Sequence, residues 1–198
     1  MNSHIAITIH RKIEMRNAIV LTIIFACLLL ITTFGEAKEP PASKYIGVKA
    51  CSMCHKAEKT GNQFSVWRKS KHAEAFKELA TPKAAEVAKA KGLTKPASES
   101  AECLQCHTIV ADAAQIEKTF DAKDGVQCEV CHGPGSAYKT MPIMKDKAKA
   151  AAAGLILYKD DAAIEAKCKT CHNEKSPTFK EFKFKDAWVK IKHSKPKS

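Results

Sequence analysis

The chain has 198 residues and a formal net charge of +12, from 33 Lys and Arg against 21 Asp and Glu. This length suits a single domain, and the 9 cysteines and 8 histidines direct attention to metal, cofactor or disulfide chemistry. The sequence contains no recognisable nucleic-acid-binding module, so its positive charge is not attributed to a nucleic-acid partner.

The N-terminal region has the pattern of a secretory signal. A short basic start at Met15 precedes an unbroken apolar stretch over 18–34, and Gly-Glu-Ala at 35–37 forms a small-x-small cleavage site. Met15 alone would open a conventional signal. The apolar stretch is at the lower length limit for spanning a bilayer, so a retained anchor is the alternative. We predict a cleaved signal peptide over 1–37 and a single mature domain over 38–198, located in the periplasm.

Every cysteine of the predicted mature chain belongs to a Cys-x-x-Cys-His motif, which occurs four times. Two thiols at this spacing can add to the two vinyl groups of one porphyrin, and the following imidazole binds the iron as the proximal ligand. Cys27 lies within the apolar stretch and is interpreted as ordinary apolar filling. The predicted attachment thiols are Cys51, Cys54, Cys103, Cys106, Cys128, Cys131, Cys168 and Cys171, and the predicted proximal ligands are His55, His107, His132 and His172.

Other uses of cysteine explain this pattern less well. Four disulfides would not require a histidine after every second cysteine. Zinc ribbons need paired Cys-x-x-Cys units without that histidine, and a thioredoxin-like motif would occur once in a βαβ unit. The sequence therefore predicts four covalently attached haem c groups.

The polypeptide is short for four haems, so we expect the porphyrins to form most of the apolar interior, and their loss to leave the chain unfolded. Alternating strand patterns are almost absent. Pro82, Gly92 and Gly154 are expected to stop helices, and Gly-Pro-Gly at 133–135 to form a turn. We predict an all-α fold, with short helices and loops wrapped around a haem cluster and little or no β-structure. Ala-, Lys- and Glu-rich stretches predict helices over 62–80, 83–91, 111–119, 144–153 and 159–167.

Two histidines remain as distal ligands once His4, His10 and the four motif histidines are set aside. His72 shares a predicted helix face with Phe76 and Leu79, which favours an inward orientation. His193 lies in the C-terminal segment. We predict that both bind iron, without assigning either to a particular haem.

Two irons then lack a distal histidine from this chain. Met141 and Met144 follow the third motif, and a thioether ligand would raise the reduction potential. Tyr138, a lysine, water, an open position, or a histidine from a neighbouring subunit are the alternatives, and the oligomeric state is left open.

Several of these motifs resemble the tetrahaem cytochrome c-554 family. The resemblance rests on Trp-x-x-Ser-x-His-x-x-Ala at 67–75, on Gly-Val-Gln-Cys-Glu-Val-Cys-His-Gly-Pro-Gly at 125–135, and on Cys-Lys-Thr-Cys-His-Asn at 168–173. It covers roughly residues 45–195. It implies a largely helical fold with closely spaced, mostly bis-histidine haems that pass electrons between periplasmic partners.

By position, His72 and His193 match distal ligands of that family. The family also has a distal histidine shortly after the Gly-Pro-Gly turn, whereas 136–150 contain none. The resemblance thus implies a first haem that is Met-ligated, weakly ligated or open. The family tolerates one five-coordinate haem, which would suit the second motif.

The sequence predicts an electron carrier between periplasmic or membrane redox partners in respiration, rather than an enzyme. Its lysine-rich C-terminal region would favour partners with acidic docking surfaces. Membrane contact is expected only through an uncleaved signal or a membrane redox complex. The alternative is a haem enzyme that reduces or oxidises nitric oxide, nitrite or hydroxylamine at an open haem.

Overall fold

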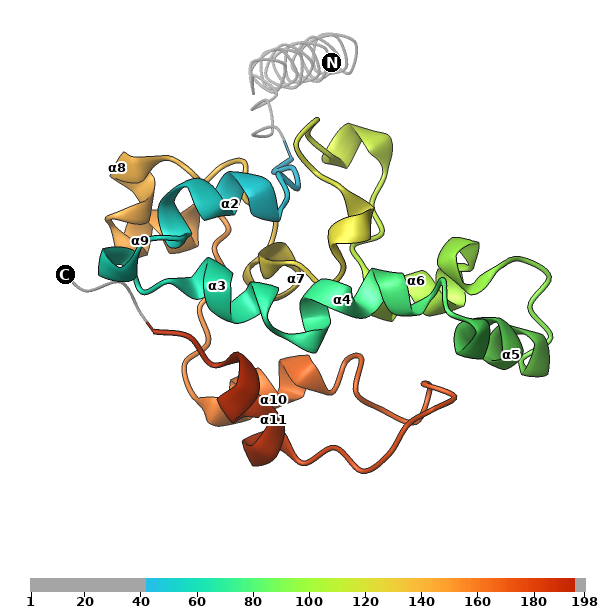
Figure 1. The fold of residues 1–198 in the computed structure, drawn as a ribbon. Helices are drawn as coiled ribbons and strands as arrows, with labels where there is room; N and C mark the ends of the chain where they lie inside the picture. Colours follow the sequence, from blue (N-terminus) through green and yellow to red (C-terminus); the bar gives the residue numbers. More distant parts are fainter. Residues whose placement is uncertain (1–41, 195–198) are drawn as a thin grey trace, which may run out of the picture. The chain divides into compact units, whose positions relative to one another are not determined.

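Short α-helices joined by turns and loops make up residues 42–194, the part of the chain that the computed structural model describes (Figure 1). The predicted signal peptide over 1–37 and the boundary at residue 38 lie outside these residues. The helices are α2 (Val48–His55), α3 (Gln63–Arg68), α4 (Lys71–Glu78), α5 (Pro82–Ala90), α6 (Ala101–His107), α7 (Cys128–His132), α8 (Met141–Met144), α9 (Lys147–Ala152), α10 (Asp161–Cys168) and α11 (Phe184–Ile191).

The all-α prediction is confirmed. Residues 42–194 contain no β-strand, and their only β-type pairing is an isolated parallel bridge between Tyr45 and Ile116. Single turns of 3-10 helix, at Glu58–Thr60, Ala97–Glu99, Ala113–Gln115 and Ala122–Asp124, connect the longer elements. Among the helices of this described part, none has the length and apolar character needed to cross a membrane.

The helix predicted over 62–80 is present but interrupted. Ser70 has an extended backbone (φ −88°, ψ 160°) and serves as the N-cap of α4, so α3 and α4 are separate helices. The predicted helices over 83–91 and 159–167 correspond to α5 and α10. Pro82 begins α5 instead of stopping a helix, because the first helical position does not need a backbone N–H.

Two other helix predictions need correction. The stretch 144–153 contains parts of two helices, since Asp146 caps α9 by accepting hydrogen bonds from the N–H groups of Ala148 and Lys149. The stretch 111–119 is wrong as a helix and holds only a 3-10 turn. Its backbone is engaged elsewhere, because Tyr45 donates to the carbonyl of Gln115 and accepts from the N–H of Glu117.

Few apolar side chains are buried by the polypeptide itself. Within residues 42–194, nine apolar residues are buried, and four of them are alanines. The cluster of Leu79, Ala88 and Ala97 joins α4, α5 and the turn that precedes α6. Met53, Val110, Leu157 and other large apolar side chains remain exposed. A core of this size agrees with an interior built largely from bound porphyrins.

Candidate haem-binding sites

The four motifs occupy short helices or their ends. Sites 1 to 4 are numbered here in chain order: site 1 lies on α2, site 2 on α6, site 3 on α7, and site 4 at the end of α10 and the turn after it. One helical turn places the two cysteines and the histidine of each motif close together, as attachment to a single porphyrin requires. All eight of these cysteines are free thiols, so the donors are available for thioether bonds.

Thiols from different motifs lie next to each other. A hydrogen bond with Cys128, together with burial, raises the pKa of the Cys51 thiol. Burial and the neighbouring Cys171 raise the pKa of Cys106 to about 11. Site 1 is therefore adjacent to site 3, and site 2 is adjacent to site 4.

A third proximity links these two pairs of sites. Burial raises the pKa of Cys131 to about 11, and smaller contributions come from Cys168 and Cys171. Tyr158, which follows α9, donates a hydrogen bond of 2.7 Å to the carbonyl of Cys131. Sites 3 and 4 are thus also neighbours.

The two histidines predicted as distal ligands each face a motif histidine. The ring centroids of His72 and His172 are 6.1 Å apart, and those of His132 and His193 are 6.0 Å apart. The interplanar angles are 49° and 47°. The structure thereby places His72 at site 4 and His193 at site 3, an assignment that the sequence leaves open.

These separations suit an iron held between two imidazoles. A metal–nitrogen bond is about 2 Å long and each ring centre lies roughly 1.1 Å further, so imidazoles on opposite sides of one metal have centroids roughly 6.2 Å apart. Burial lowers the pKa of His72, His132, His172 and His193, which favours the neutral form that binds metal. The donor set therefore fits a haem at each of these two sites.

Three motif histidines have an oxygen acceptor at Nδ1. His107 donates to the carbonyl of Ala75 over 2.6 Å, and His132 to the carbonyl of Ile156 over 3.2 Å. His55 Nδ1 lies 3.2 Å from the side-chain oxygen of Gln63. Because an oxygen of this kind can only accept, Nδ1 carries the proton and Nε2 keeps the lone pair that an iron needs.

Helix α4 serves two sites. It carries His72, and its last turn tightens because the N–H of Leu79 bonds to the carbonyl of Phe76. The carbonyl of Ala75, which that N–H would meet in a regular α-helix, accepts instead from His107. The same helix thus supplies a candidate ligand of site 4 and orients the proximal histidine of site 2.

The segment before the third motif fixes His72. The indole of Trp67 donates to the carbonyl of Val126 over 2.8 Å, and the N–H of Val126 donates to the carbonyl of His72 over 2.9 Å. Gly125 has φ +75°, and a Cβ there would lie 2.5 Å from the His72 carbonyl oxygen. Only glycine allows the chain to pass this close.

Two buried polar side chains, one just before and one within the third motif, hold the start of α2. The Glu129 carboxylate accepts hydrogen bonds from the N–H groups of Ile46, Gly47 and Gly135, at 2.7–3.2 Å. Gln127 accepts from the N–H of Val48 over 2.7 Å. Both side chains belong to residues only 2% exposed, so sites 1 and 3 share a rigid buried connection.

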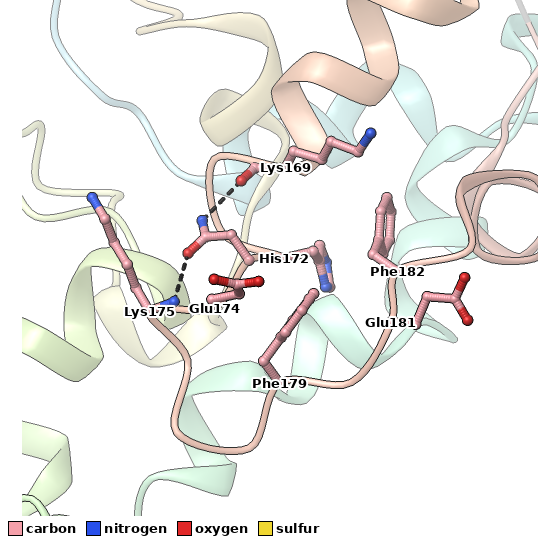
Figure 2. Close-up of a pocket in the computed structure, with 8 residues that line it drawn as sticks. Lys169, His172, Glu174, Lys175, Phe179, Glu181 and Phe182 are labelled. Atoms are coloured by element: carbon pink, nitrogen blue, oxygen red, sulfur yellow. Dashed lines mark hydrogen bonds between the residues drawn. The ribbon is translucent and has the colours of Figure 1, made fainter.

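A cavity of about 710 Å³ adjoins His172, between the end of α10 and the segment that leads to α11. Figure 2 shows the His172 imidazole with Phe179 and Phe182 on its two sides. The Phe182 ring stacks on the imidazole with centroids 4.7 Å apart and planes 16° apart. This contact restricts rotation of the imidazole and gives the cavity an apolar wall suited to a porphyrin edge.

Comparison with known proteins agrees with these motifs. A family model described as "Cytochrome c554 and c-prime" matches residues 50–133. Cytochrome c-554 of Nitrosomonas europaea is 30% identical over 159 residues, which cover 74% of this chain and 65% of that protein. The family model and this relative together support a place in the cytochrome c-554 family. No solved structure matches it significantly.

This similarity, together with the four motifs, supports a c-type cytochrome, in which iron-containing haem c is attached covalently through Cys-x-x-Cys-His. The cysteines and histidines described above are the groups that would hold it. The haem supplies reversible one-electron chemistry, and the polypeptide supplies attachment, axial ligands and control of solvent access.

In the described part of the chain, the other predicted ligands do not face a second imidazole. Within residues 42–194, neither His55 nor His107 is paired with a second histidine ring. Tyr138 is buried, and its hydroxyl donates to the carbonyls of His132 and Gly133, which stabilises the turn at 133–135. Met141 is 55% exposed at the start of α8, and Met144 ends that helix.

Sequence reasoning missed three polar residues that support the sites: Gln63, Gln127 and Glu129. Their contacts join segments that are far apart in the chain. The one available signal was the position of Glu129 inside a Cys-x-x-Cys motif, where a charged residue that is buried needs hydrogen-bond partners.

Proposed function

We propose that the chain is an exported tetrahaem c-type cytochrome that carries electrons between periplasmic or membrane-bound redox partners in respiration. The observation that carries this proposal is the pair of facing imidazoles at site 3 and site 4. Two histidines on one iron fill both axial positions, which suits electron transfer because no substrate can reach the metal. The proposed ligand sets are His132 with His193 and His172 with His72.

The proposed electron path runs through the sites in the order 1, 3, 4, 2. Adjacent thiols at sites 1 and 3 and at sites 2 and 4 support its two outer steps. The proximity of Cys131 to Cys168 supports the central step. Sites 1 and 2 are then the ends of the path, where electrons enter and leave.

A basic surface beside sites 3 and 4 is proposed to dock an acidic partner. Exposed lysines surround α11, close to His172 and His193, and Val189 on that helix is 72% exposed. Opposite charges would steer the encounter, and added salt would weaken it. The described lysines of this surface are Lys180, Lys183, Lys185, Lys190 and Lys192.

Haem counting and ligand replacement test the proposed carrier. A pyridine haemochrome assay of the mature protein is expected to give four haem c per chain. His72→Ala and His193→Ala are each expected to convert one low-spin haem into a high-spin haem that binds carbon monoxide when reduced. Lys192→Ala, beside His193, is the matched control and should leave the spectra unchanged. Fewer than four haems, or histidine variants with unchanged spectra, would refute the proposal.

A second function is favoured by His55 and His107, which face no other histidine ring within residues 42–194. In this alternative, an open haem at site 1 or 2 reduces or oxidises nitric oxide, nitrite or hydroxylamine. Electron paramagnetic resonance of the oxidised protein, with and without nitric oxide, separates the two. A fully low-spin spectrum that ignores nitric oxide excludes the enzyme. A high-spin component that binds nitric oxide, followed by steady-state turnover, establishes it.

A further inference from the structure

The side chain of Gln63, at the start of α3, connects two segments that carry candidate iron ligands. Its oxygen lies 3.2 Å from Nδ1 of His55. Its nitrogen donates to the carbonyl of Thr60 over 2.5 Å and to the carbonyl of Ser194 over 2.9 Å. Ser194 directly follows His193, so this amide lies between the proximal histidine of site 1 and the candidate distal histidine of site 3.

The orientation of the amide follows from its partners. The carbonyls of Thr60 and Ser194 can only accept hydrogen bonds, so they must face the NH₂ group of Gln63. The amide oxygen is then turned toward His55, whose Nδ1 must donate. All three contacts are satisfied by one amide orientation, and His55 Nε2 is left free for iron.

His55, His132 and His193 lie close enough together to influence one another's pKa. The pKa of His193 is lowered mainly by burial, and also by His55. The pKa of His132 is likewise lowered mainly by burial, with His193 and His55 among the further causes. His55, His132 and His193 therefore lie within a short range of one another.

We propose that Gln63 is a positioning residue that links site 1 to site 3, and this inference rests on the proposed haem ligation. Its oxygen fixes the tautomer and ring orientation of His55. Its nitrogen ties down the backbone beside His193 and keeps that imidazole at its iron. The amide is the one neutral side-chain group of this length that can do both, because it has an acceptor and a donor at its end.

Two substitutions separate these roles. Gln63→Glu keeps an acceptor for His55 and strengthens it with negative charge, but it has no N–H for Ser194. Gln63→Met has similar length and provides neither a donor nor a strong acceptor. A stronger acceptor at Nδ1 makes the imidazole more basic and stabilises ferric iron, so the potential of haem 1 should fall in the Glu variant and rise in the Met variant.

The rate of carbon monoxide binding at site 3 supplies an independent readout. Both variants lose the hydrogen bond to the Ser194 carbonyl, so His193 should leave the ferrous iron more readily. Loss of such outer contacts typically weakens metal ligation by about 10- to 100-fold. We therefore expect carbon monoxide to bind haem 3 roughly 10- to 100-fold faster in both variants than in the wild type.

The experiment uses the full-length holoprotein, with individual haems followed by NMR of their methyl groups during redox titration, and carbon monoxide binding followed by flash photolysis. Gln115→Met is the matched control, because Gln115 contacts only the backbone of Asp112 with its side chain. The expected result is opposite shifts of haem 1, faster binding at haem 3, and unchanged haems 2 and 4, with the control like wild type.

Shifts of haem 1 in the same direction, unchanged carbon monoxide kinetics, or equal shifts of all four haems would each overturn the inference. Failure of the proposed function is visible separately, because the wild-type protein would then lack four haems or a bis-histidine signature. A wild type with both features and Gln63 variants without effect refutes the positioning role alone.

Discussion

The N–H of Val126 donates a hydrogen bond of 2.9 Å to the carbonyl of His72, so the segment that leads into the third motif holds a candidate ligand of the fourth. Trp67 reinforces this contact through its bond to the carbonyl of Val126. His72 is therefore held by backbone as well as by its own helix, and its position depends on how closely the chain passes at Gly125.

Gly125→Ala tests this dependence. The new Cβ would lie 2.5 Å from the His72 carbonyl oxygen at φ +75°. We expect a loss of about 1–3 kcal/mol in the free energy of unfolding, and a high-spin component at haem 4 as His72 moves. Denaturant unfolding and electron paramagnetic resonance measure the two effects.

Gly92→Ala is the control for Gly125→Ala, because Gly92 has φ +70° but no atom within 4 Å of its Cβ position. It should cost about 1 kcal/mol through backbone conformation and leave every haem spectrum unchanged. Equal spectral changes in the two variants would contradict the specific role of Gly125.

Glu129→Ala should destabilise the fold strongly. It leaves three buried N–H groups without their acceptor, at an expected total cost of about 3–5 kcal/mol. For a domain of this size that corresponds to a fall in melting temperature of roughly 10 °C, measured by circular dichroism. Glu117→Ala removes a partly exposed ion pair with Lys139 and should change stability by less than about 1 kcal/mol. Similar losses in both variants would show that the Glu129 contacts are not important.

Tyr138→Phe distinguishes a structural tyrosine from an iron ligand or a catalytic group. The hydroxyl donates to the carbonyl of Gly133 over 2.6 Å, so its removal should cost about 1 kcal/mol. Optical and paramagnetic spectra of all haems should remain those of the wild type, as should nitric oxide binding. A change in the spin state of any haem would assign Tyr138 to iron.

Expression without haem attachment should give an unfolded chain. The nine apolar side chains buried within residues 42–194, four of them alanines, cannot offset the entropy of ordering this polypeptide. Far-ultraviolet circular dichroism of the haem-free chain should therefore show little helix and no cooperative thermal transition. A cooperative transition near that of the holoprotein would show that the polypeptide forms its own core.

The sequence predicts the attachment residues because the chemistry of each motif is local. Helices such as α5 and α10 could also be predicted, since their Ala- and Lys-rich composition agrees with their final structure. The stretch 111–119 has a similar composition but is not a helix, because hydrogen bonds to Tyr45 require an extended backbone at Ile116. Tertiary contacts override helix propensity there.

The pairing of the candidate histidine ligands could not be predicted either, because it depends on tertiary contacts. His72 and His172 are brought together by α4 and by the turn after α10. The local sequence around either histidine does not indicate which histidine it will face. The role of Gln63 could not be predicted for the same reason, since a glutamine at the start of a helix is usually solvated. Its role depends on the C-terminal segment returning to it.

One turn of α4 lies between the His72 side chain and the Ala75 carbonyl that His107 contacts. Because both groups lie on one short helix, a displacement of α4 would move the candidate ligand of site 4 and the acceptor of the site 2 histidine together. If haems occupy both sites, oxidation or reduction of one would be felt at the other through this helix, and the pair should titrate cooperatively.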